Sequence, residues 1–403
     1  MNERQLEALS IVKNGYSLFL TGSAGTGKSF TVKSIIDYFK SIDKSYGLTA
    51  LTGCAAVLIN GKTIHSFLGL GISRDLNEIY KRLCKFKSNL NYLKNLEVLI
   101  IDEISMMDQE LFELISKLLI LIKNNEKLFG GIQLILIGDF YQLPPINGDY
   151  CFISQVWSDL NLIPIILTQL IRQKDDNQLQ IILEEIRNSK PSEKTFEILS
   201  ELKKTSFKNK EIKPTRLYPI NKNVDKINEL EFMRLVKKNK GEIMTYKALS
   251  NNKKENIDMY NITLTIGAQV MIYRTISVEN KLFNGTRGII CALNEKDVII
   301  KDIDNNLHTI NYYTDIIDIS YNKKKLISFM PLKLAYALSI HKSQGSSINY
   351  LEIDLGNDIF ISGQLYTALS RATNINNIRI INLSKNSFIK NEKIKKFYES
   401  IKK

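Results

Sequence analysis

Gly22-Ser23-Ala24-Gly25-Thr26-Gly27-Lys28-Ser29 is the stretch that decides the fold of this 403-residue chain. The apolar residues 16–20 precede it and a helical pattern follows it, so the stretch joins a strand to a helix. In that context the glycines let backbone N–H groups curl around phosphates, while Lys28 reaches the outer phosphates and Ser29 binds Mg²⁺. The spacing predicts a loop of eight residues that binds a nucleoside triphosphate. A glycine-rich turn without a nucleotide is the alternative interpretation.

Short apolar runs alternate with helical segments around this loop. They lie at residues 16–20, 48–51, 98–101 and 132–137. Near-continuous apolar strands joined by helices are typical of a parallel sheet that is covered on both faces. The first half of the chain is therefore predicted to be an α/β nucleotide-binding domain.

Two acidic residues, Asp102 and Glu103, end the run at 98–101. Ligand groups gather at the carboxyl ends of parallel strands. We expect Asp102 to hold Mg²⁺ together with Ser29, and Glu103 to polarise the attacking water. A pair of acids after a strand is common, so this interpretation depends on the loop that ends at Ser29.

The next run ends in Gly138-Asp139-Phe140-Tyr141-Gln142-Leu143-Pro144-Pro145. Two successive prolines fix an extended exit that cannot continue as a helix. The pattern predicts that Gln142 points at the γ-phosphate. An ordinary Gly-Asp turn with a proline stop is the competing interpretation.

A basic amphipathic helix is predicted across residues 76–90. Its apolar residues repeat at alternating spacings of three and four, with basic residues around them: Leu76, Ile79, Leu83, Phe86 and Leu90. Such a stripe packs against a core. Whether its basic side touches nucleic acid is left open.

The second half of the chain shows two patterns. Apolar strands are predicted at residues 216–220 and 270–273, and shorter ones at 288–292, 298–301 and 308–313, separated by Asn, Asp and Lys turns. Short strands at that pitch favour a small antiparallel barrel. The lysine-rich segment 385–403 is interpreted as a solvated helix face.

Composition places limits on class and partners. A length of 403 residues predicts two main domains, and 55 basic against 42 acidic residues give a net charge of +13, which favours a polyanionic partner. An AT-biased coding sequence is another source of the lysine excess. The four cysteines, Cys54, Cys84, Cys151 and Cys291, form no Cys-x-x-Cys pair, which argues against a zinc site and a disulfide framework.

Location is predicted only coarsely. No apolar stretch approaches the length of a membrane span, and residues 1–5 lack the basic start and apolar run of a secretory signal. A soluble intracellular protein in a reducing compartment is expected. The nucleus, the mitochondrion, the bacterial cytoplasm and a viral replication site are not distinguished.

Taken together, the motifs resemble those of superfamily 1 helicases of the Pif1 type, which are similar to the RecD group. The resemblance covers nearly the whole chain and includes residues 2–5, 49–56, 63–67, 101–108, 129–139, 167–173, 266–271 and 283–288. Ile171 stands where phenylalanine is usual in this family. Two later motifs are decisive, because a generic phosphate-loop protein has no reason to carry both: Ala335-Tyr-Ala-Leu-Ser-Ile-His341-Lys342-Ser343-Gln344-Gly345 and Gly363-Gln-Leu-Tyr-Thr-Ala-Leu-Ser-Arg371-Ala-Thr373.

The resemblance implies further site residues. Gln5 is expected to read adenine and Gly345 to contact the nucleotide. Arg172 is expected to point at the nucleotide from the first motor domain, and Arg371 to reach the γ-phosphate from the second. The residues implied in DNA contact are Thr52, Gly53, His65, Ser66, His341, Lys342, Ser343 and Gln344.

The resemblance also implies the domain organisation. Two RecA-like parallel-sheet P-loop NTPase domains are expected, the first from residues 1–68 and 95–175 and the second from residues 176–283 and 331–403. A small helical wedge is expected at residues 69–94, and a small SH3-like β-barrel insertion at residues 284–330.

The function implied is that of an ATP-dependent DNA helicase that uses Mg²⁺. Such a protein translocates 5′ to 3′ on single-stranded DNA and unwinds forked or tailed duplexes in replication, repair or recombination. The core is expected to be a monomer without a membrane partner, and the sequence does not reveal which proteins it binds. The preferred substrate, whether fork, G-quadruplex or RNA–DNA hybrid, is not predicted, because such proteins read backbone more than bases.

Two other functions compete. A P-loop ATPase switch or loader would remodel a DNA-bound partner without processive translocation, and Arg371 together with Gln344 argues against it. A single-strand binder without enzymatic activity would not need the intact set of Lys28, Asp102, Glu103 and Arg371. His308 is interpreted as structural, and Trp157 as a core residue and not a base-stacking one.

Overall fold

The computed structural model describes residues 1–71, 74–171, 176–207, 211–219, 221–251, 257–274, 276–277, 282, 285–320, 323–355, 359 and 361–402. The chain forms two compact units. Unit 1 comprises Met1–Pro191, Phe360–Ser370 and Phe388–Lys403, and unit 2 comprises Ser192–Ile359 and Arg371–Ser387. Each unit has its own sheets and its own core.

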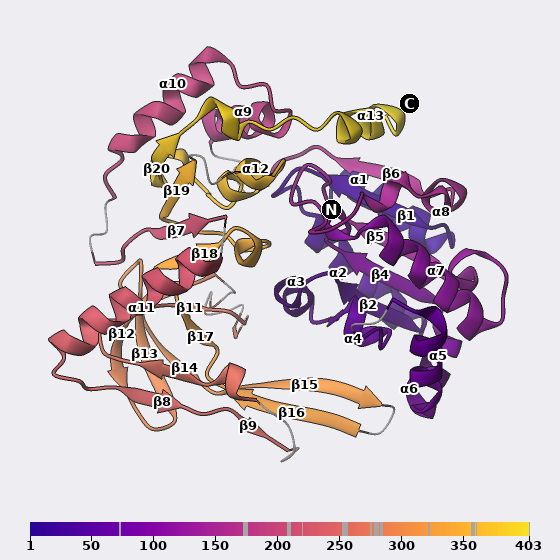
Figure 1. The fold of residues 1–403 in the computed structure, drawn as a ribbon, viewed down its shortest axis with the longest axis horizontal. Helices are drawn as coiled ribbons and strands as arrows, with labels where there is room; N and C mark the ends of the chain where they lie inside the picture. The colour runs from indigo at the N-terminus through magenta and orange to yellow at the C-terminus, as the bar shows by residue number, and fades with distance from the viewer. Residues whose placement is uncertain are drawn as a thin grey trace. The chain divides into compact units, whose positions relative to one another are not determined.

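Unit 1 is built on a parallel sheet, as predicted. In the part of the chain that the structure describes, its order is β3-β2-β4-β5-β1-β6 (Figure 1). The strands are β1 (Leu18–Gly22), β2 (Tyr46–Ala50), β3 (Lys62–Thr63), β4 (Val98–Asp102), β5 (Gln133–Ile137) and β6 (Ile163–Leu167). β1 lies between β5 and β6, with Leu18 opposite both Ile135 and Ile163. The strand that precedes the phosphate loop is therefore inside the sheet. β5 runs parallel beside it, and β4 runs parallel on the other side of β5.

Each face of this sheet is covered by its own apolar core. Helices α1 (Glu3–Lys13) and α2 (Lys28–Ser41) cover one face, where Leu18, Ile35 and Phe39 are fully buried. Helices α7 (Gln109–Lys123) and α13 (Glu392–Ser400) contribute to the core of the other face. Trp157 is 8% exposed in that second core, which agrees with its predicted core role.

The helix predicted at residues 76–90 is two helices in the structure. α5 (Leu76–Cys84) ends before Phe86, and α6 (Lys87–Asn95) begins after it. Phe86 has a non-helical backbone (φ −112°, ψ 72°) and is 59% exposed, so it does not belong to the buried stripe. One straight helix would carry Leu93 away from the core. The break at Phe86 lets both helices contact α7 and buries Leu93.

Arg74, which precedes α5, joins this helical insertion to the rest of unit 1 through an ion pair. Its guanidinium binds both carboxylate oxygens of Asp108 at 2.9 Å. Asp108 also caps α7, because its Oδ1 accepts the Leu111 N–H at 2.8 Å. A bidentate pair of this kind fixes direction as well as distance.

Several further helices belong to unit 1 by their packing: α3 (Gly53–Leu58), α4 (Ile64–Phe67), α8 (Gln155–Asp159), α9 (Asn177–Arg187) and α12 (Gln364–Leu369). The predicted division puts α9, α12 and α13 in the second domain, whereas their contacts group them with unit 1. That division stays a proposal. None of the helices in the described ranges is long and apolar enough to cross a membrane.

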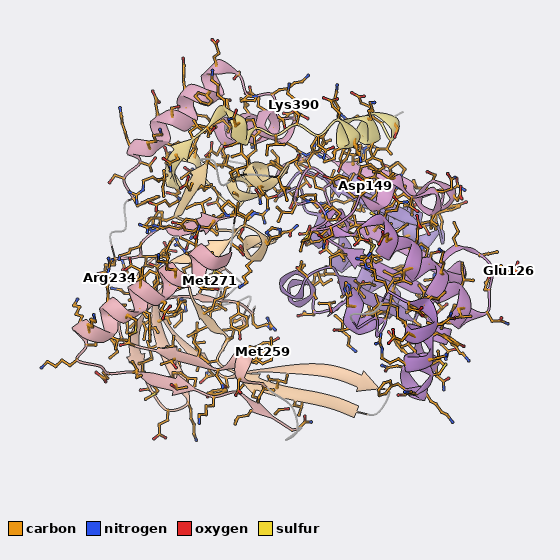
Figure 2. The ribbon with its side chains drawn as sticks, viewed as in Figure 1. Glu126, Asp149, Arg234, Met259, Met271 and Lys390 are labelled. Carbon is orange, nitrogen blue, oxygen red and sulfur yellow. The ribbon has the colours of Figure 1, made fainter. Side chains whose placement is uncertain are left out.

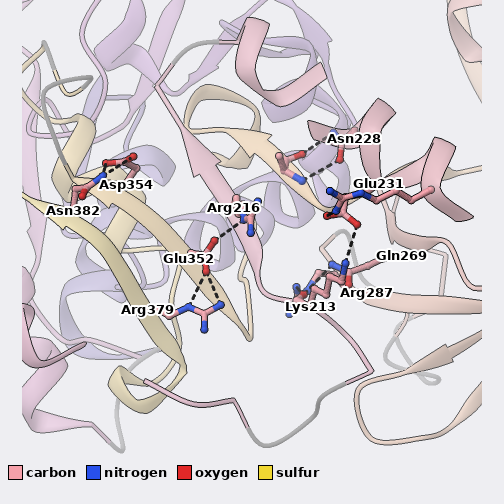
Figure 3. A network of polar contacts seen from close by, with 12 residues as sticks. Lys213, Arg216, Asn228, Glu231, Gln269, Arg287, Glu352, Asp354, Arg379 and Asn382 are labelled. Carbon is pink, nitrogen blue, oxygen red and sulfur yellow. Dashed lines mark hydrogen bonds and ion pairs between the residues drawn. The ribbon is translucent and has the colours of Figure 1, made fainter. Parts of the chain in front are cut away.

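Unit 2 contains a second parallel sheet, of order β18-β7-β19-β20 in its described residues. These strands are β7 (Thr215–Tyr218), β18 (Ala337–Ser339), β19 (Leu351–Leu355) and β20 (Ile378–Leu383). Glu352 on β19 forms ion pairs with the neighbouring strands β7 and β20. Its Oε1 lies 2.5 Å from Arg216 Nε, and its Oε2 lies 2.6 Å from Arg379 Nη2 (Figure 3). Helices α10 (Glu193–Glu201) and α11 (Asn221–Lys238) belong to the same unit.

The rest of unit 2 is antiparallel. Among the described residues, one five-stranded sheet has the order β14-β13-β12-β11-β17, and smaller sheets pair β10 with β8 and join β15, β16 and β9. The strands are β8 (Met244–Tyr246), β9 (Leu249–Ser250), β10 (Ile262–Leu264), β11 (Gln269–Ile272), β12 (Arg287–Leu293), β13 (Asp297–Asp302), β14 (Leu307–Asn311), β15 (Tyr313–Ser320), β16 (Lys323–Phe329) and β17 (Leu332–Leu334). This arrangement is compatible with the predicted small barrel.

Two details of the antiparallel region differ from the expected strands. β11 and β17 pair with the five-stranded sheet although they lie outside residues 284–330. The strand expected at 308–313 is divided between β14 and β15, which belong to different sheets. His308 is structural in this region, because its Nε2 lies 2.7 Å from Asp302 Oδ2.

Candidate active site

The phosphate loop joins β1 to α2, and its glycines are required by its shape. Gly25 and Gly27 have left-handed backbones, with φ of 86° and 88°. A Cβ on Gly22 would lie 2.3 Å from the Leu167 carbonyl oxygen on the neighbouring strand. The glycines therefore allow the tight curve of the loop directly before α2, and a helix N-terminus favours anions.

Lys28 lies inside the curve of this loop. Its Nζ donates to the Gly22 carbonyl at 2.8 Å and to the Ser23 carbonyl at 3.0 Å. Burial lowers the pKa of Lys28, while the nearby carboxylates of Asp139, Glu103 and Asp102 oppose that shift. The ammonium group is held by two carbonyl oxygens that a phosphate can replace.

Asp102 and Glu103 stand at the end of β4, as predicted. Asp102 Oδ1 accepts the Glu103 N–H at 2.8 Å. Burial raises the pKa of Asp102, against the opposing effects of that hydrogen bond and of the Lys28 charge. Glu103 has a left-handed backbone (φ 54°), which is a strained conformation often found at functional sites. The hydroxyl of Ser29 and the carboxylate of Asp102 are oxygen donors of the kind that Mg²⁺ prefers.

Gln5 lies against the phosphate loop at Gly27. It is 2% exposed, and its Nε2 lies 2.7 Å from the point that a Cβ on Gly27 would occupy. A capping box with Asn2 fixes the side chain, because Gln5 Oε1 accepts the Asn2 N–H at 3.0 Å. Among the residues that the structure describes, Gln5 Nε2 is buried without a hydrogen-bond partner. An unsatisfied buried donor is costly, so this amide fits an acceptor atom of a bound base.

The turn that carries Gln142 lies against α12. Gln142 is 4% exposed, and its N–H donates to the Asp139 carbonyl at 2.8 Å. A Cβ on Gly363, which precedes α12, would lie 2.1 Å from the Gln142 carbonyl oxygen. From the same helix, Tyr366 Oη accepts the Ala24 N–H at 2.9 Å. The start of α12 therefore contacts both the phosphate loop and the Gln142 turn.

Arg172 lies outside the described residues. The residue before it is placed on the phosphate loop, because the Ile171 N–H donates to the Gly25 carbonyl at 2.8 Å. The expectation that Arg172 points at the nucleotide stays a prediction.

Asp139, Arg187 and Tyr398 form a buried group that the sequence did not single out. Asp139 is fully buried, with Oδ1 and Oδ2 lying 2.8 Å from Arg187 Nη2 and 3.1 Å from Arg187 Nε. Burial opposes ionisation of Asp139, but the Arg187 guanidinium outweighs it and holds the pKa of that carboxyl below its usual value. The only sequence signal is that Asp139 precedes Gln142 in a turn after a strand.

The DNA-contact candidates of unit 1 lie near the ends of β2 and β3. Thr52 Oγ1 accepts the Ala55 N–H at 3.1 Å, and Gly53 is exposed at the start of α3. His65 and Ser66 are exposed on α4. Partial burial and the charge of Arg74 lower the pKa of His65. These residues present hydroxyl, imidazole and backbone groups that suit phosphates.

The candidates of unit 2 follow β18. Lys342 and Gly345 are exposed, whereas Ser343 and Gln344 are buried. Ser343 Oγ donates to the Ile340 carbonyl at 2.8 Å. Arg371 follows α12 and is 2% exposed. Lys28 and Arg371 belong to different units, so a shared nucleotide stays a prediction.

Sheet order, phosphate loop and strand-end acids define this chain as a P-loop NTPase of RecA-like fold. More narrowly, it belongs to the PIF1-like helicase family. A family model of that description matches residues 2–193. The ATP-dependent DNA helicase Pif1 of Bdellovibrio bacteriovorus is 31% identical over 99% of this chain and 92% of that protein.

Solved structures show the same likeness. Bacteroides sp Pif1 in complex with ADP-AlF4 has a TM-score of 0.84 and 26% identity, over all of this chain and 97% of that one. The Bacteroides Pif1 helicase in complex with ADP-AlF3 and ssDNA has a TM-score of 0.70 and 25% identity, with the same coverage. The chain spans 62% to 65% of the length of three other curated relatives, which are PIF1 helicases of Emericella nidulans, Xenopus laevis and Danio rerio.

Proposed function

We propose that this chain is an ATP-dependent DNA helicase that moves 5′ to 3′ along single-stranded DNA and unwinds forked or tailed duplexes. The observation that carries the proposal is the group of residues around the phosphate loop. The charge of Lys28 interacts with Asp102 and Glu103 at the end of β4, and Gln5 Nε2, which has no hydrogen-bond partner among the described residues, lies beside Gly27. The family membership and the nucleotide-bound and DNA-bound relatives support the same activity.

The residues of unit 1 have distinct roles in hydrolysis. Backbone N–H groups of the loop and Lys28 bind the β- and γ-phosphates of ATP, in exchange for the carbonyl contacts of the Lys28 ammonium. Ser29 and Asp102 hold Mg²⁺, which neutralises charge on the phosphates when it is bound. Glu103 orients and deprotonates the attacking water, and Gln142 points at the γ-phosphate. Gln5 reads the adenine edge.

Charge from the arginines completes this site. Arg172 and Arg371 stabilise the charge that develops on the transferred phosphoryl group. Because Arg371 belongs to unit 2, hydrolysis is coupled to closure of the two units around ATP. Closure and reopening let the contacts of Thr52, Gly53, His65 and Ser66 alternate with those of residues 341–344 along the strand.

Strand separation tests the proposal. A duplex with a 5′ single-stranded tail is mixed with the protein, ATP and Mg²⁺, and release of the labelled strand is followed by stopped-flow fluorescence. We expect release after a lag that lengthens with the duplex, and no release from a duplex with only a 3′ tail. Lys28→Ala is the control, and it should abolish both DNA-stimulated phosphate release and unwinding.

The same experiment separates the competing functions. ATP hydrolysis without a length-dependent lag would support a switch or loader that does not translocate. Phosphate release that is unchanged in Lys28→Ala would contradict the assignment of the phosphate loop. Unwinding of the 3′-tailed duplex alone would contradict the direction.

A further inference from the structure

Helix α13 belongs to unit 1 and is distant in sequence from the phosphate loop and the strand-end acids. Ile394 and Tyr398 are buried, and the Phe397 ring stacks on Phe152 with centroids 4.3 Å apart. Asn391 caps the helix and donates through Nδ2 to Tyr150 Oη at 3.0 Å. At the surface, Lys393 Nζ lies 2.6 Å from Asp149, the residue labelled in Figure 2. The helix is therefore held in one position on the domain.

The Tyr398 hydroxyl joins two loops of the nucleotide site. Its Oη lies 2.7 Å from Thr21 Oγ1, 377 residues away in sequence. The same oxygen accepts the Phe140 N–H at 3.1 Å and lies 3.1 Å from Asp139 Oδ1. An ionised carboxylate only accepts hydrogen bonds, so Tyr398 donates to Asp139 and the Thr21 hydroxyl donates to Tyr398. All three hydrogen bonds of this phenol are used.

Two of the three partners of Tyr398, Thr21 and Asp139, act on the phosphate loop. Thr21 is the fully buried residue before Gly22, where the loop begins. Asp139 is, after burial, the largest influence on the pKa of Lys28. Asp139 also sets the turn of Gln142, through its carbonyl bond to the Gln142 N–H. The hydroxyl therefore links the start of the Lys28 loop to the start of the Gln142 turn.

We infer that Tyr398 is a positioning residue for ATP hydrolysis, which acts through Thr21 and Asp139 to fix the phosphate loop and the Gln142 turn in one relative position. The inference rests on the proposed function. The effect of Tyr398 falls on catalysis more than on ATP binding, because small displacements of groups around the γ-phosphate cost rate steeply.

Two conservative substitutions test this role: Tyr398→Phe and Thr21→Val, made singly and together. The ATP turnover number kcat and the KM are measured with saturating single-stranded DNA, and active sites are counted by titration with a fluorescent ADP analogue. We expect Tyr398→Phe to lower kcat per active site about tenfold, with KM changed less than about twofold. The double variant should be no slower than Tyr398→Phe, because the two hydroxyls act as one unit.

Tyr150→Phe is the matched control. It removes the same atom from a neighbouring tyrosine and weakens the anchor of α13 at Asn391, without contact to Asp139 or Thr21. We expect kcat within about twofold of the wild type. Two results would overturn the inference. One is an equal loss of kcat in Tyr150→Phe and Tyr398→Phe. The other is a loss of kcat in the double variant that equals the product of the losses in Tyr398→Phe and Thr21→Val.

The wild-type protein in the same assay separates this inference from the proposed function. If the wild type shows no DNA-stimulated hydrolysis, the proposed function fails and the role of Tyr398 fails with it. If the wild type hydrolyses ATP and Tyr398→Phe does so equally well per active site, only the role of Tyr398 is contradicted.

Discussion

We expect Gln5 to recognise the adenine base, because its buried Nε2 has no hydrogen-bond partner among the described residues. If Gln5 Nε2 donates to adenine, Gln5→Ala should raise the KM for ATP by about tenfold, since a neutral hydrogen bond contributes about 0.5–1.5 kcal/mol. The KM for GTP should change little, so that the preference for ATP is lost. Steady-state hydrolysis with each nucleotide measures both values.

Asn2→Ala serves as the control for Gln5→Ala. It breaks the same capping box, in which Asn2 Oδ1 accepts the Gln5 N–H at 2.9 Å, but keeps the Gln5 amide. Its KM for ATP should stay near the wild-type value. Equal increases of KM for ATP and GTP in Gln5→Ala would contradict base recognition.

The ion pair of Asp139 and Arg187 makes the stability of the fold depend on pH. The lowered pKa of Asp139 determines the direction of that dependence. A carboxyl with a depressed pKa in the folded state stabilises the fold above its unfolded pKa, near about pH 4, and loses that contribution as the pH falls through the folded pKa. Asp139→Asn should cost about 3–5 kcal/mol at pH 7, because it leaves a buried guanidinium without its counter-charge.

Urea unfolding of the wild type and Asp139→Asn between pH 3 and pH 7 measures this dependence. The difference in the free energy of unfolding should be constant above about pH 5 and should narrow below about pH 4. A difference that stays constant down to pH 3 would show that folding does not lower the pKa of Asp139.

Local residues explain why the phosphate loop was predictable and the Tyr398 contacts were not. The glycines, Lys28 and Ser29 are consecutive, and each is required by the shape or charge of the same loop. Tyr398 meets Thr21 only because α13 packs on unit 1, and no spacing in the sequence encodes a contact across 377 residues.

At the scale of elements, α13 completes the aromatic core of unit 1. Its Phe397 ring lies 5.9 Å from the Trp157 ring and 5.3 Å from the Phe140 ring, centroid to centroid. Phe397→Ala should lower the stability of unit 1 by about 2 kcal/mol, less than for a fully buried phenylalanine because Phe397 is half-buried.

Trp157 reports this change directly, because it is the single tryptophan of the chain. In Phe397→Ala its fluorescence emission should shift to the red as water reaches the ring, and thermal unfolding followed at Trp157 should begin at a lower temperature. Lys393→Ala, which removes only the surface pair with Asp149, should leave the emission unchanged. An unshifted spectrum in Phe397→Ala would mean that α13 does not pack on this core.

Element types were more predictable than element ends. The apolar runs of unit 1 became parallel strands because a run of that composition is stable only inside a covered sheet. The helix at residues 76–90 broke at Phe86 because burial of Leu93 against the core depends on where α7 lies. Helical periodicity carries no information on the position of a partner helix.

At the scale of the whole molecule, the net charge of +13 predicts salt-sensitive binding of single-stranded DNA. With about five phosphate contacts, affinity should fall by about 10² between 50 mM and 200 mM salt, because bound counterions are released. Lys342→Ala should reduce the slope of log K against log salt by about 0.7. Lys390→Ala, on the exposed segment before α13, should leave the slope unchanged.

Fluorescence anisotropy with a labelled oligonucleotide gives these slopes. The net charge of the chain predicted a polyanionic partner. It did not identify the lysines that bind this partner, because the sequence does not distinguish exposed lysines of the tail from those of the candidate surface. Equal slopes for the wild type and Lys342→Ala would remove Lys342 from the interface.

We propose that ATP hydrolysis needs both units, with Lys28 from one and Arg371 from the other. Arg371→Gln tests this requirement when kcat and the ATP dissociation constant are measured with saturating single-stranded DNA and the folding of both units is checked by circular dichroism and thermal unfolding. We expect Arg371→Gln to lower kcat by about 10³, with an ATP dissociation constant within a few-fold of the wild type. A folded Arg371→Gln protein that hydrolyses ATP at the wild-type rate would contradict it.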